Sequence, residues 1–147
     1  MIDENRPYRR IEIDKIFTKA KEVMHNAALL RGKEKGLEKA HYYDIYTGKE
    51  LIGGDAYDYE HIRSSEEIHS KYKSVLSDDQ IALVVNCPEN IGVTLSFINK
   101  SKGKRKMENW LGNPSNIVVN EIDLKLTLAN LKKADEGIVR RVWELMK

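Results

Sequence analysis

Apolar residues recur at helical spacing in the first quarter of the chain. After a polar stretch over residues 1–10, they follow every three or four positions: Ile16, Phe17, Ala20, Val23, Met24, Ala27 and Leu30. This period places them on one face of an α-helix. The pattern therefore predicts a helix over residues 12–31, preceded by an extended polar arm.

The character of the sequence changes near residue 42, where tyrosine and isoleucine replace alanine and lysine. Thr47-Gly48 and Gly53-Gly54 are typical turn dipeptides. Together they predict a β-hairpin with one strand near residues 42–46 and the other near residues 56–61.

The middle of the chain carries helix signals with identifiable caps. Ser64 or Ser65 precedes glutamates and predicts a helix start, and Ser77 and Gln80 occupy capping-box positions of a following helix. Pro88 ends that helix. The next segment, "NIGVTLSF", predicts a short strand or turn that leads into a helix. "INKSKGKRKMENWLG" is then expected to be helical at least in part.

The last third of the chain permits two interpretations. "DLKLTL" alternates like a strand, yet several apolar residues also fit a helical period: Leu124, Leu128, Leu131 and Ala134. We favour helices over residues 120–147, the second of them beginning near Glu136. Four residues are expected to form its packing stripe: Val139, Val142, Trp143 and Met146. Trp110 is expected in the core, and Cys87 as a small buried filler.

Composition fits one modest domain. The 147 residues are 41% hydrophobic and 33% charged, which predicts a single α+β domain over residues 1–147. A single cysteine excludes an internal disulfide and a cysteine-rich zinc site and favours a reducing compartment. The sequence has no apolar run of membrane-spanning length, and its N-terminus lacks the apolar core of a signal peptide. We therefore expect a cytoplasmic protein with no membrane partner.

Positive charge is concentrated although the net charge is only +2. Five basic residues crowd into one short segment: Lys100, Lys102, Lys104, Arg105 and Lys106. Such a run is usually a solvated face, but its place directly after Asn99 favours contact with a phosphate backbone, which carries no sequence information. A smaller group near the start, Arg6, Arg9 and Arg10, is the nearest candidate for DNA recognition.

Candidate chemistry lies in two segments. "DYEHI" places Glu60 before His61, and "ENIGVTLSFINKSKGKR" places Asn90 and Asn99 beside the basic cluster. Phosphodiester hydrolysis requires a base, for which an imidazole is suited, and a divalent cation, which carboxylate and amide oxygens bind. Asp58 alternates with Glu60 along the expected strand and is a reserve ligand.

The ordered segments "YTGKEL … DYEHI … ENIGVTLSFINKSKGK" resemble the HNH nuclease motif of the ββα-metal fold. They are most similar to its cysteine-free type, as in the HNH domain of CRISPR RNA-guided nucleases. The resemblance covers residues 42–111. It departs from the family in having Glu60 where Asp is commoner, no proline after "HI", and a longer segment between His61 and Asn90.

The resemblance implies a metal-dependent endonuclease that acts on DNA with Mg²⁺ or Mn²⁺. It implies that His61 is the general base and that Glu60 and Asn99 are metal ligands. It also implies that Asn90 ties the two halves of the motif together by hydrogen bonds. In the family, the cut leaves a 5′ phosphate. A phage, a mobile element or a defence system is the expected setting.

Other readings of the sequence stay open. The chain fits an inactive nucleic-acid-binding or adaptor module of the same fold, or a nuclease toxin that acts on RNA. Asn99 also fits an ordinary helix N-cap. A double-strand cut by an enzyme with one site would suggest a homodimer, for which the terminal helices are the candidate interface.

Overall fold

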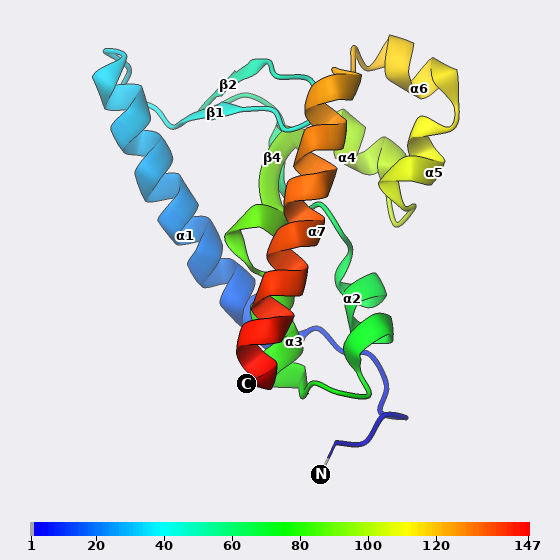
Figure 1. Ribbon diagram of the computed structural model, residues 1–147. Helices are drawn as coiled ribbons and strands as arrows, with labels where there is room; N and C mark the ends of the chain where they lie inside the picture. The colour runs from blue at the N-terminus through cyan, green and yellow to red at the C-terminus, as the bar shows by residue number, and fades with distance from the viewer. Residues whose placement is uncertain (1) are drawn as a thin grey trace.

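Helices dominate residues 2–147, the part of the chain described by the computed structural model, and short strands lie between them (Figure 1). The expected mixed α+β class is confirmed. In chain order the elements are α1 (Ile11–Glu34), β1 (His41–Tyr43), β2 (Glu50–Ile52), β3 (Tyr57–His61), α2 (Ser65–Tyr72), α3 (Asp78–Val85), the 3₁₀ turn η1 (Pro88–Asn90), β4 (Ile91–Leu95), α4 (Ser96–Lys102), α5 (Met107–Leu111), α6 (Pro114–Val119) and α7 (Leu124–Met146). Across residues 2–147, no helix combines the length and the apolar character that crossing a membrane requires.

The strands pair in two small antiparallel sheets. β1 pairs with β2, with Tyr42 opposite Leu51. β3 pairs with β4, with Glu60 opposite Gly92. The predicted hairpin between residues 42–46 and 56–61 is therefore wrong. The turn signals correctly indicate where the chain reverses, but they do not specify which strand a reversed segment joins, and β3 finds its partner only after α2 and α3.

The helix caps predicted in the middle of the chain agree with the structure. Ser64 caps α2 by accepting a hydrogen bond from the Glu67 amide, at 3.1 Å. Ser77 and Gln80 form a reciprocal capping box at α3. Both caps satisfy backbone N–H groups that have no partner inside the helix.

A buried aspartate joins the two sheets. The Asp44 Oδ1 atom accepts hydrogen bonds from the Tyr46 amide at 2.8 Å and the Thr94 hydroxyl at 2.9 Å. Its Oδ2 atom accepts one from the Leu95 amide at 3.0 Å. Aspartate commonly satisfies the amides of its own turn. Here the same carboxylate also holds the "YTG" turn against β4.

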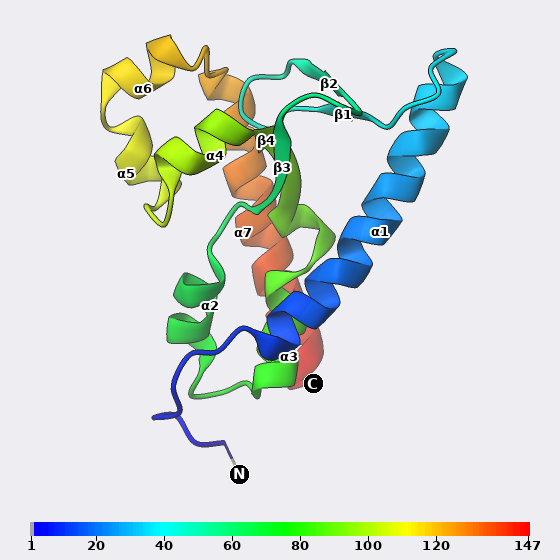
Figure 2. The ribbon, with the colours of Figure 1, turned by 180° about the vertical axis from the view of Figure 1, so that it is seen from behind.

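β4 passes directly into α4, so that an antiparallel strand pair is followed at once by a helix. Figure 2 shows this pair in the middle of the molecule, with α1 on one side and α4 on the other. Gly103 ends α4 with a φ of 56°, a left-handed conformation that other residues rarely adopt. The expected helical segment after "NIGVTLSF" is thereby split into α4 and α5.

The core contains the residues expected there. Trp110 and Cys87 are fully buried. Beneath α4 and α5 lies one apolar cluster: Tyr46, Ile62, Ile98, Met107, Trp110, Ile122, Leu131 and Ala134. Burial also raises the pKa of the Cys87 thiol, with nearby Glu89 as a second cause. The cysteine therefore stays protonated at neutral pH, as a filler should.

The C-terminal region is one continuous helix, not two. Asp123 caps α7 by accepting from the Leu126 amide at 3.0 Å. The helix runs through Glu136 without a break. At Gly137, an added Cβ would lie 2.6 Å from the Glu89 side chain. The glycine therefore permits the close contact between α7 and η1 and does not end the helix.

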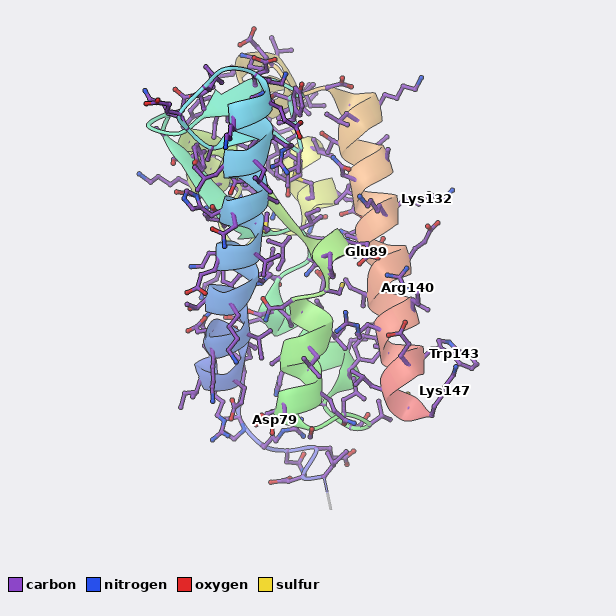
Figure 3. The ribbon with its side chains drawn as sticks, turned by 90° about the vertical axis from the view of Figure 1, so that its left-hand side faces the viewer. Asp79, Glu89, Lys132, Arg140, Trp143 and Lys147 are labelled. Carbon is purple, nitrogen blue, oxygen red and sulfur yellow. The ribbon has the colours of Figure 1, made fainter. Side chains whose placement is uncertain are left out.

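The predicted packing stripe on α7 is largely wrong. Val142 is buried, but Val139, Trp143 and Met146 are exposed, and Trp143 retains 70% of its accessible surface. Figure 3 shows Trp143 on the side of α7 that faces away from α1 and α3. The helical period identifies an apolar face. How much of that face is buried depends on where the neighbouring elements pack.

Candidate active site

A cavity of about 230 Å³ lies beside the end of β3, between the start of α1 and the helix α4. Its lining includes Glu60, His61, Asn99 and Lys102. These residues come from β3 and α4, which are far apart in the chain. Within this lining Glu60 and His61 alternate along β3: Glu60 contacts Lys102 of α4, and His61 packs on Phe17 of α1.

The rim of this cavity is strongly basic. Its lining also contains five further cationic side chains: Arg10, Arg63, Lys104, Arg105 and Lys106. Only Glu60 and Glu67 contribute acidic groups to the lining. Most of these cations are ion-paired, Arg63 with Glu108 and Asp135 outside the lining, so the positive charge left for an anionic ligand comes chiefly from the exposed Arg105 and the exposed, weakly paired Lys104 and Lys106.

Glu60 is buried with one carboxylate oxygen engaged and the other free. Its Oε1 atom accepts a hydrogen bond from the Lys102 ammonium at 2.8 Å, and both side chains are 5% exposed. Its Oε2 atom makes no hydrogen bond to any residue between 2 and 147. The buried Tyr46 hydroxyl neighbours Glu60 and likewise has no hydrogen bond of good geometry. Burial raises the pKa of this hydroxyl, as do the Glu60 charge and a side-chain hydrogen bond to Glu60. The Tyr46 hydroxyl is therefore a protein donor available to the buried Glu60 carboxylate.

Asn99 lies within α4 and is not its N-cap, which is Leu95. The Asn99 Nδ2 atom donates to Asp58 Oδ2 at 3.0 Å, and the Ser96 hydroxyl donates to Asp58 Oδ1 at 3.1 Å. The N-cap reading of Asn99 is therefore wrong. Because the amide nitrogen is engaged, the amide oxygen is the group that remains for a ligand.

Asp58, the reserve ligand, is absent from the lining of the cavity. It shares a strand face with Glu60, as the alternation predicts. Its two oxygens are used by Ser96 and Asn99. In this arrangement Asp58 orients Asn99 instead of reaching the cavity itself.

His61 is half-buried at the end of β3. Its Nε2 atom lies 2.8 Å from the Asn86 Oδ1 atom, and its ring lies 4.1 Å from the Phe17 ring, centroid to centroid. Burial lowers the pKa of His61 to about 4, and the Asn86 hydrogen bond offsets part of this effect. The ring is thus neutral at pH 7, the form in which an imidazole accepts a proton.

Asn90 is fully buried and does not line the cavity. Its Oδ1 atom accepts from the Arg63 amide at 2.7 Å. Its Nδ2 atom donates to the carbonyl oxygens of Arg63 at 3.1 Å and Val85 at 2.9 Å. These bonds tie the segment after β3 to the end of α3.

The basic cluster divides into three kinds of residue. Lys104, Arg105 and Lys106 are exposed and line the cavity, whereas Lys100 is exposed but outside it. Lys102 differs from the expected solvated phosphate contact because it is buried against Glu60. Asn99 and Lys102 lie three positions apart, so α4 presents both on one face.

The N-terminal arginines do not form one group. The Arg6 guanidinium donates to Asp78 Oδ1 at 2.7 Å and to three backbone carbonyl oxygens, those of Asp3, Lys73 and Leu76. It therefore fixes the arm to the loop before α3 and is not free for DNA. Of the three arginines, only Arg10 lines the cavity.

Three contributors to the site were not recognised in the sequence. In the sequence, Phe17 fits the apolar stripe of a helix. The positions of Asn86 and Arg63 along the chain do not connect either residue with His61. The one available signal for Asn86 is a polar residue at the end of the apolar run "IALVV". A polar side chain placed there is commonly a helix cap, so the signal does not indicate a site.

The donor set for a divalent cation is small, and the Lys102 ammonium already contacts one oxygen of Glu60. Among residues 2–147, no three His, Cys, Asp or Glu side chains group closely enough to hold a metal. Mg²⁺ nevertheless keeps several waters and takes few protein oxygens. The two oxygens that such an ion would take here are the Oε2 atom of Glu60, which is buried, and the amide oxygen of Asn99.

No protein-family model, curated protein or solved structure matches the chain. A function is therefore inferred from the geometry of the cavity and the chemistry of its lining.

Proposed function

We propose that the protein is a metal-dependent HNH endonuclease that hydrolyses phosphodiester bonds in DNA. The observation that carries this proposal is the shared cavity of Glu60, His61 and Asn99. These residue types are the ones that the HNH resemblance assigns to a metal ligand, a base and a second ligand.

The arrangement of β3, β4 and α4 supports a ββα-metal core. The two strands are antiparallel, and the helix follows the second strand with no intervening loop. The base comes from the first strand and Asn99 from the helix. This order of elements is the one that the resemblance implies, although α2 and α3 are inserted between the strands.

In the proposed reaction, neutral His61 takes a proton from the attacking water. Glu60 and Asn99 would hold the Mg²⁺ or Mn²⁺ ion, which when bound offsets negative charge on the phosphate and the departing oxygen. Asp58 holds the Asn99 amide in the orientation that leaves its oxygen free. Asn90 keeps the segment after His61 in register with α3.

The basic rim supplies the substrate contact. Lys104, Arg105, Lys106 and Arg10 lie around the cavity and are suited to hold phosphates on both sides of the scissile bond. Such contacts position a nucleic-acid backbone but carry no sequence information. The proposed enzyme therefore binds the phosphate backbone at this rim without reading the base sequence there.

Plasmid cleavage with a matched pair of histidine variants tests this proposal. Supercoiled DNA is incubated with the protein and Mg²⁺ or Mn²⁺, beside His61→Ala and His25→Ala. His25 is exposed on α1 and does not line the cavity. We expect wild type and His25→Ala to nick or cut, and His61→Ala to lose about 100-fold or more of the rate, the usual contribution of a general base.

Equal cleavage by wild type and His61→Ala would contradict the assignment of the base. Cleavage that persists unchanged in EDTA would contradict the metal. A parallel incubation with single-stranded RNA distinguishes a nuclease toxin from a DNA enzyme.

One observation favours the second candidate, a nucleic-acid-binding module without catalysis. Lys102 already places a positive charge against Glu60, where the proposed cation would bind. Retention of the plasmid in a gel-shift assay, with no cleavage under any divalent cation, would support this alternative.

A further inference from the structure

The orientation of the Asn86 side chain is determined by its neighbours. Asn86 follows α3 as its C-cap and is 7% exposed. Its Nδ2 atom lies 3.1 Å from the Ile13 carbonyl oxygen and 2.9 Å from the Ala82 carbonyl oxygen. Both partners only accept hydrogen bonds, so the amide nitrogen must face them. The Asn86 Oδ1 atom must then be the atom that faces His61.

This orientation specifies the protonation of the imidazole. The Asn86 Oδ1 atom accepts hydrogen bonds and cannot donate one. The His61 Nε2 atom, at 2.8 Å, must therefore carry a proton. In the neutral ring, the remaining lone pair is then on Nδ1.

The Nδ1 atom is available to a ligand. No residue between 2 and 147 makes a hydrogen bond with it. It is also not among the buried side-chain atoms of that range that lack a partner, so it reaches solvent. His61 is also part of the cavity lining, on the side where its ring packs against Phe17 of α1.

Two residues outside the motif together confine the ring. Asn86 fixes its Nε2 edge, and Phe17 packs on its face with 38° between the ring planes. Asn86 is in turn held by α1 through Ile13 and by α3 through Ala82. The packing of α1 on α3 thus determines the direction of the imidazole.

We propose that Asn86 is a positioning residue that holds His61 in the Nε2–H tautomer and makes Nδ1 the base. The catalytic consequence rests on the proposed nuclease function, whereas the tautomer does not. When Nδ1 takes the proton from water, the ring becomes an imidazolium, and its Nε2–H bond to Asn86 remains in place. The neutral amide orients the ring without bringing a second negative charge beside Glu60.

Nitrogen-15 NMR of the full chain tests the tautomer directly. The chain has four histidines, and the His61 signals are assigned by their loss in His61→Gln. Near neutral pH, we expect the His61 Nε2 atom to be protonated and its hydrogen-bonded proton to exchange slowly enough to be observed. A proton on Nδ1 in the wild type would overturn the proposal.

Two substitutions of Asn86 separate positioning from packing. Asn86→Leu removes the acceptor and both donated bonds, so the His61 ring proton should be lost to exchange. Asn86→Asp loses the bonds to the Ile13 and Ala82 carbonyl oxygens but keeps an acceptor for Nε2–H. We expect both variants to be less stable than wild type but only Asn86→Leu to lose the ring proton.

Asn120→Leu is the matched control. Asn120 is likewise 7% exposed, is the C-cap of a helix, α6, and donates from Nδ2 to the carbonyl oxygen four residues before it, at 2.8 Å. It does not contact His61. Asn120→Leu should leave the His61 ring signals unchanged.

Cleavage kinetics give the second readout. In Asn86→Leu, kcat should fall about 10- to 100-fold with KM for DNA unchanged, because a misdirected base affects the chemical step. Asn86→Asp should retain most of kcat, and Asn120→Leu all of it. The proposal would be overturned if Asn86→Leu kept the His61 ring proton and the kcat seen in Asn120→Leu. It would also be overturned if Asn86→Asp lost the ring proton and kcat as Asn86→Leu does.

The outcomes also separate the two proposals. An Nε2–H tautomer that depends on Asn86, in a protein that cleaves no nucleic acid, would leave the tautomer standing and refute the nuclease. Cleavage that depends on His61 but is unaffected by substitution of Asn86 would support the nuclease and refute the positioning role of Asn86. If Asn86→Leu does not fold, the wild-type spectrum and Asn86→Asp still decide the question.

Discussion

Two groups of ion pairs flank the cavity, and they are built differently. Lys102 and Glu60 make a single hydrogen bond of 2.8 Å with both side chains 5% exposed. Arg63 binds Glu108 and Asp135 with two nitrogen–oxygen contacts each, the shortest at 2.6 Å and 2.8 Å. Only the arginine is buried there, since the carboxylates keep 46% and 53% of their exposure.

The difference indicates separate purposes. The bidentate contacts satisfy Arg63 and join the end of β3 to α5 and α7 while the acids stay hydrated. The Lys102–Glu60 pair removes two charges from water for one hydrogen bond, an arrangement that contributes little net stability. We interpret the Arg63 group as a structural tie and the Lys102–Glu60 pair as part of the site.

The largest effect is expected from Lys102→Met, which breaks the buried pair. Glu60 would then be a buried carboxylate without a counter-charge, at a cost of about 3–4 kcal/mol in the free energy of unfolding. Urea denaturation at neutral pH measures this loss. Mg²⁺ should restore part of it, because a cation that binds only the folded state stabilises that state.

Lys104→Met is the matched control, since Lys104 is 91% exposed and its nearest carboxylate oxygen, on Glu66, is 3.5 Å away. Its loss should change stability by less than about 0.5 kcal/mol. A Mg²⁺ effect of equal size in Glu60→Gln/Lys102→Met and in Lys102→Met would show that Glu60 does not hold the ion.

Arg63→Met should have a smaller effect, about 2 kcal/mol, from the loss of hydrogen bonds to charged groups. The loss is smaller than for Lys102→Met because water solvates Glu108 and Asp135 once the arginine is gone. Urea denaturation again measures it, with Arg140→Met as the control because Arg140 is 56% exposed. An Arg63→Met loss larger than that of Lys102→Met would reverse the comparison.

The smallest expected effect is the change in the free energy of unfolding at low pH that comes from Glu108, the acid bound by Arg63. Hydrogen bonding from Arg63 lowers the pKa of Glu108 from 4.5 to about 2. A lowered acid pKa stabilises the fold above pH 4.5, and this contribution is lost as the pH falls toward 2. In Glu108→Gln, that part of the acid dependence should disappear from urea denaturation measured across this range. An unchanged profile would show that the half-exposed pair contributes nothing measurable.

Prediction from the sequence worked best where a signal is local. The caps at Ser64 and Ser77 were predicted from residues within one turn, and the buried Trp110 follows from the apolar pattern around it. The predicted hairpin failed because pairing partners are not local: β3 joins β4, and no short pattern states this. Trp143 was misplaced for a similar reason, since its exposure depends on which neighbours cover α7.

The candidate site shows the same distinction between local and long-range features. Its residue types and their order, Glu60-His61 and then Asn99, were readable as a motif. The buried Lys102–Glu60 pair and the Asn86–His61 contact were not, because each joins segments whose distance in space is set only when the helices pack.

The sequence by itself determined the helix caps, the α+β class and the residue types of a candidate hydrolytic site, because propensity and periodicity act within a few residues. Only the tertiary structure decided which strands pair, that Lys102 is buried against Glu60, and that Asn86 faces His61. These contacts depend on the packing of α1, α3 and α4, where burial and hydrogen bonding between distant segments are settled together.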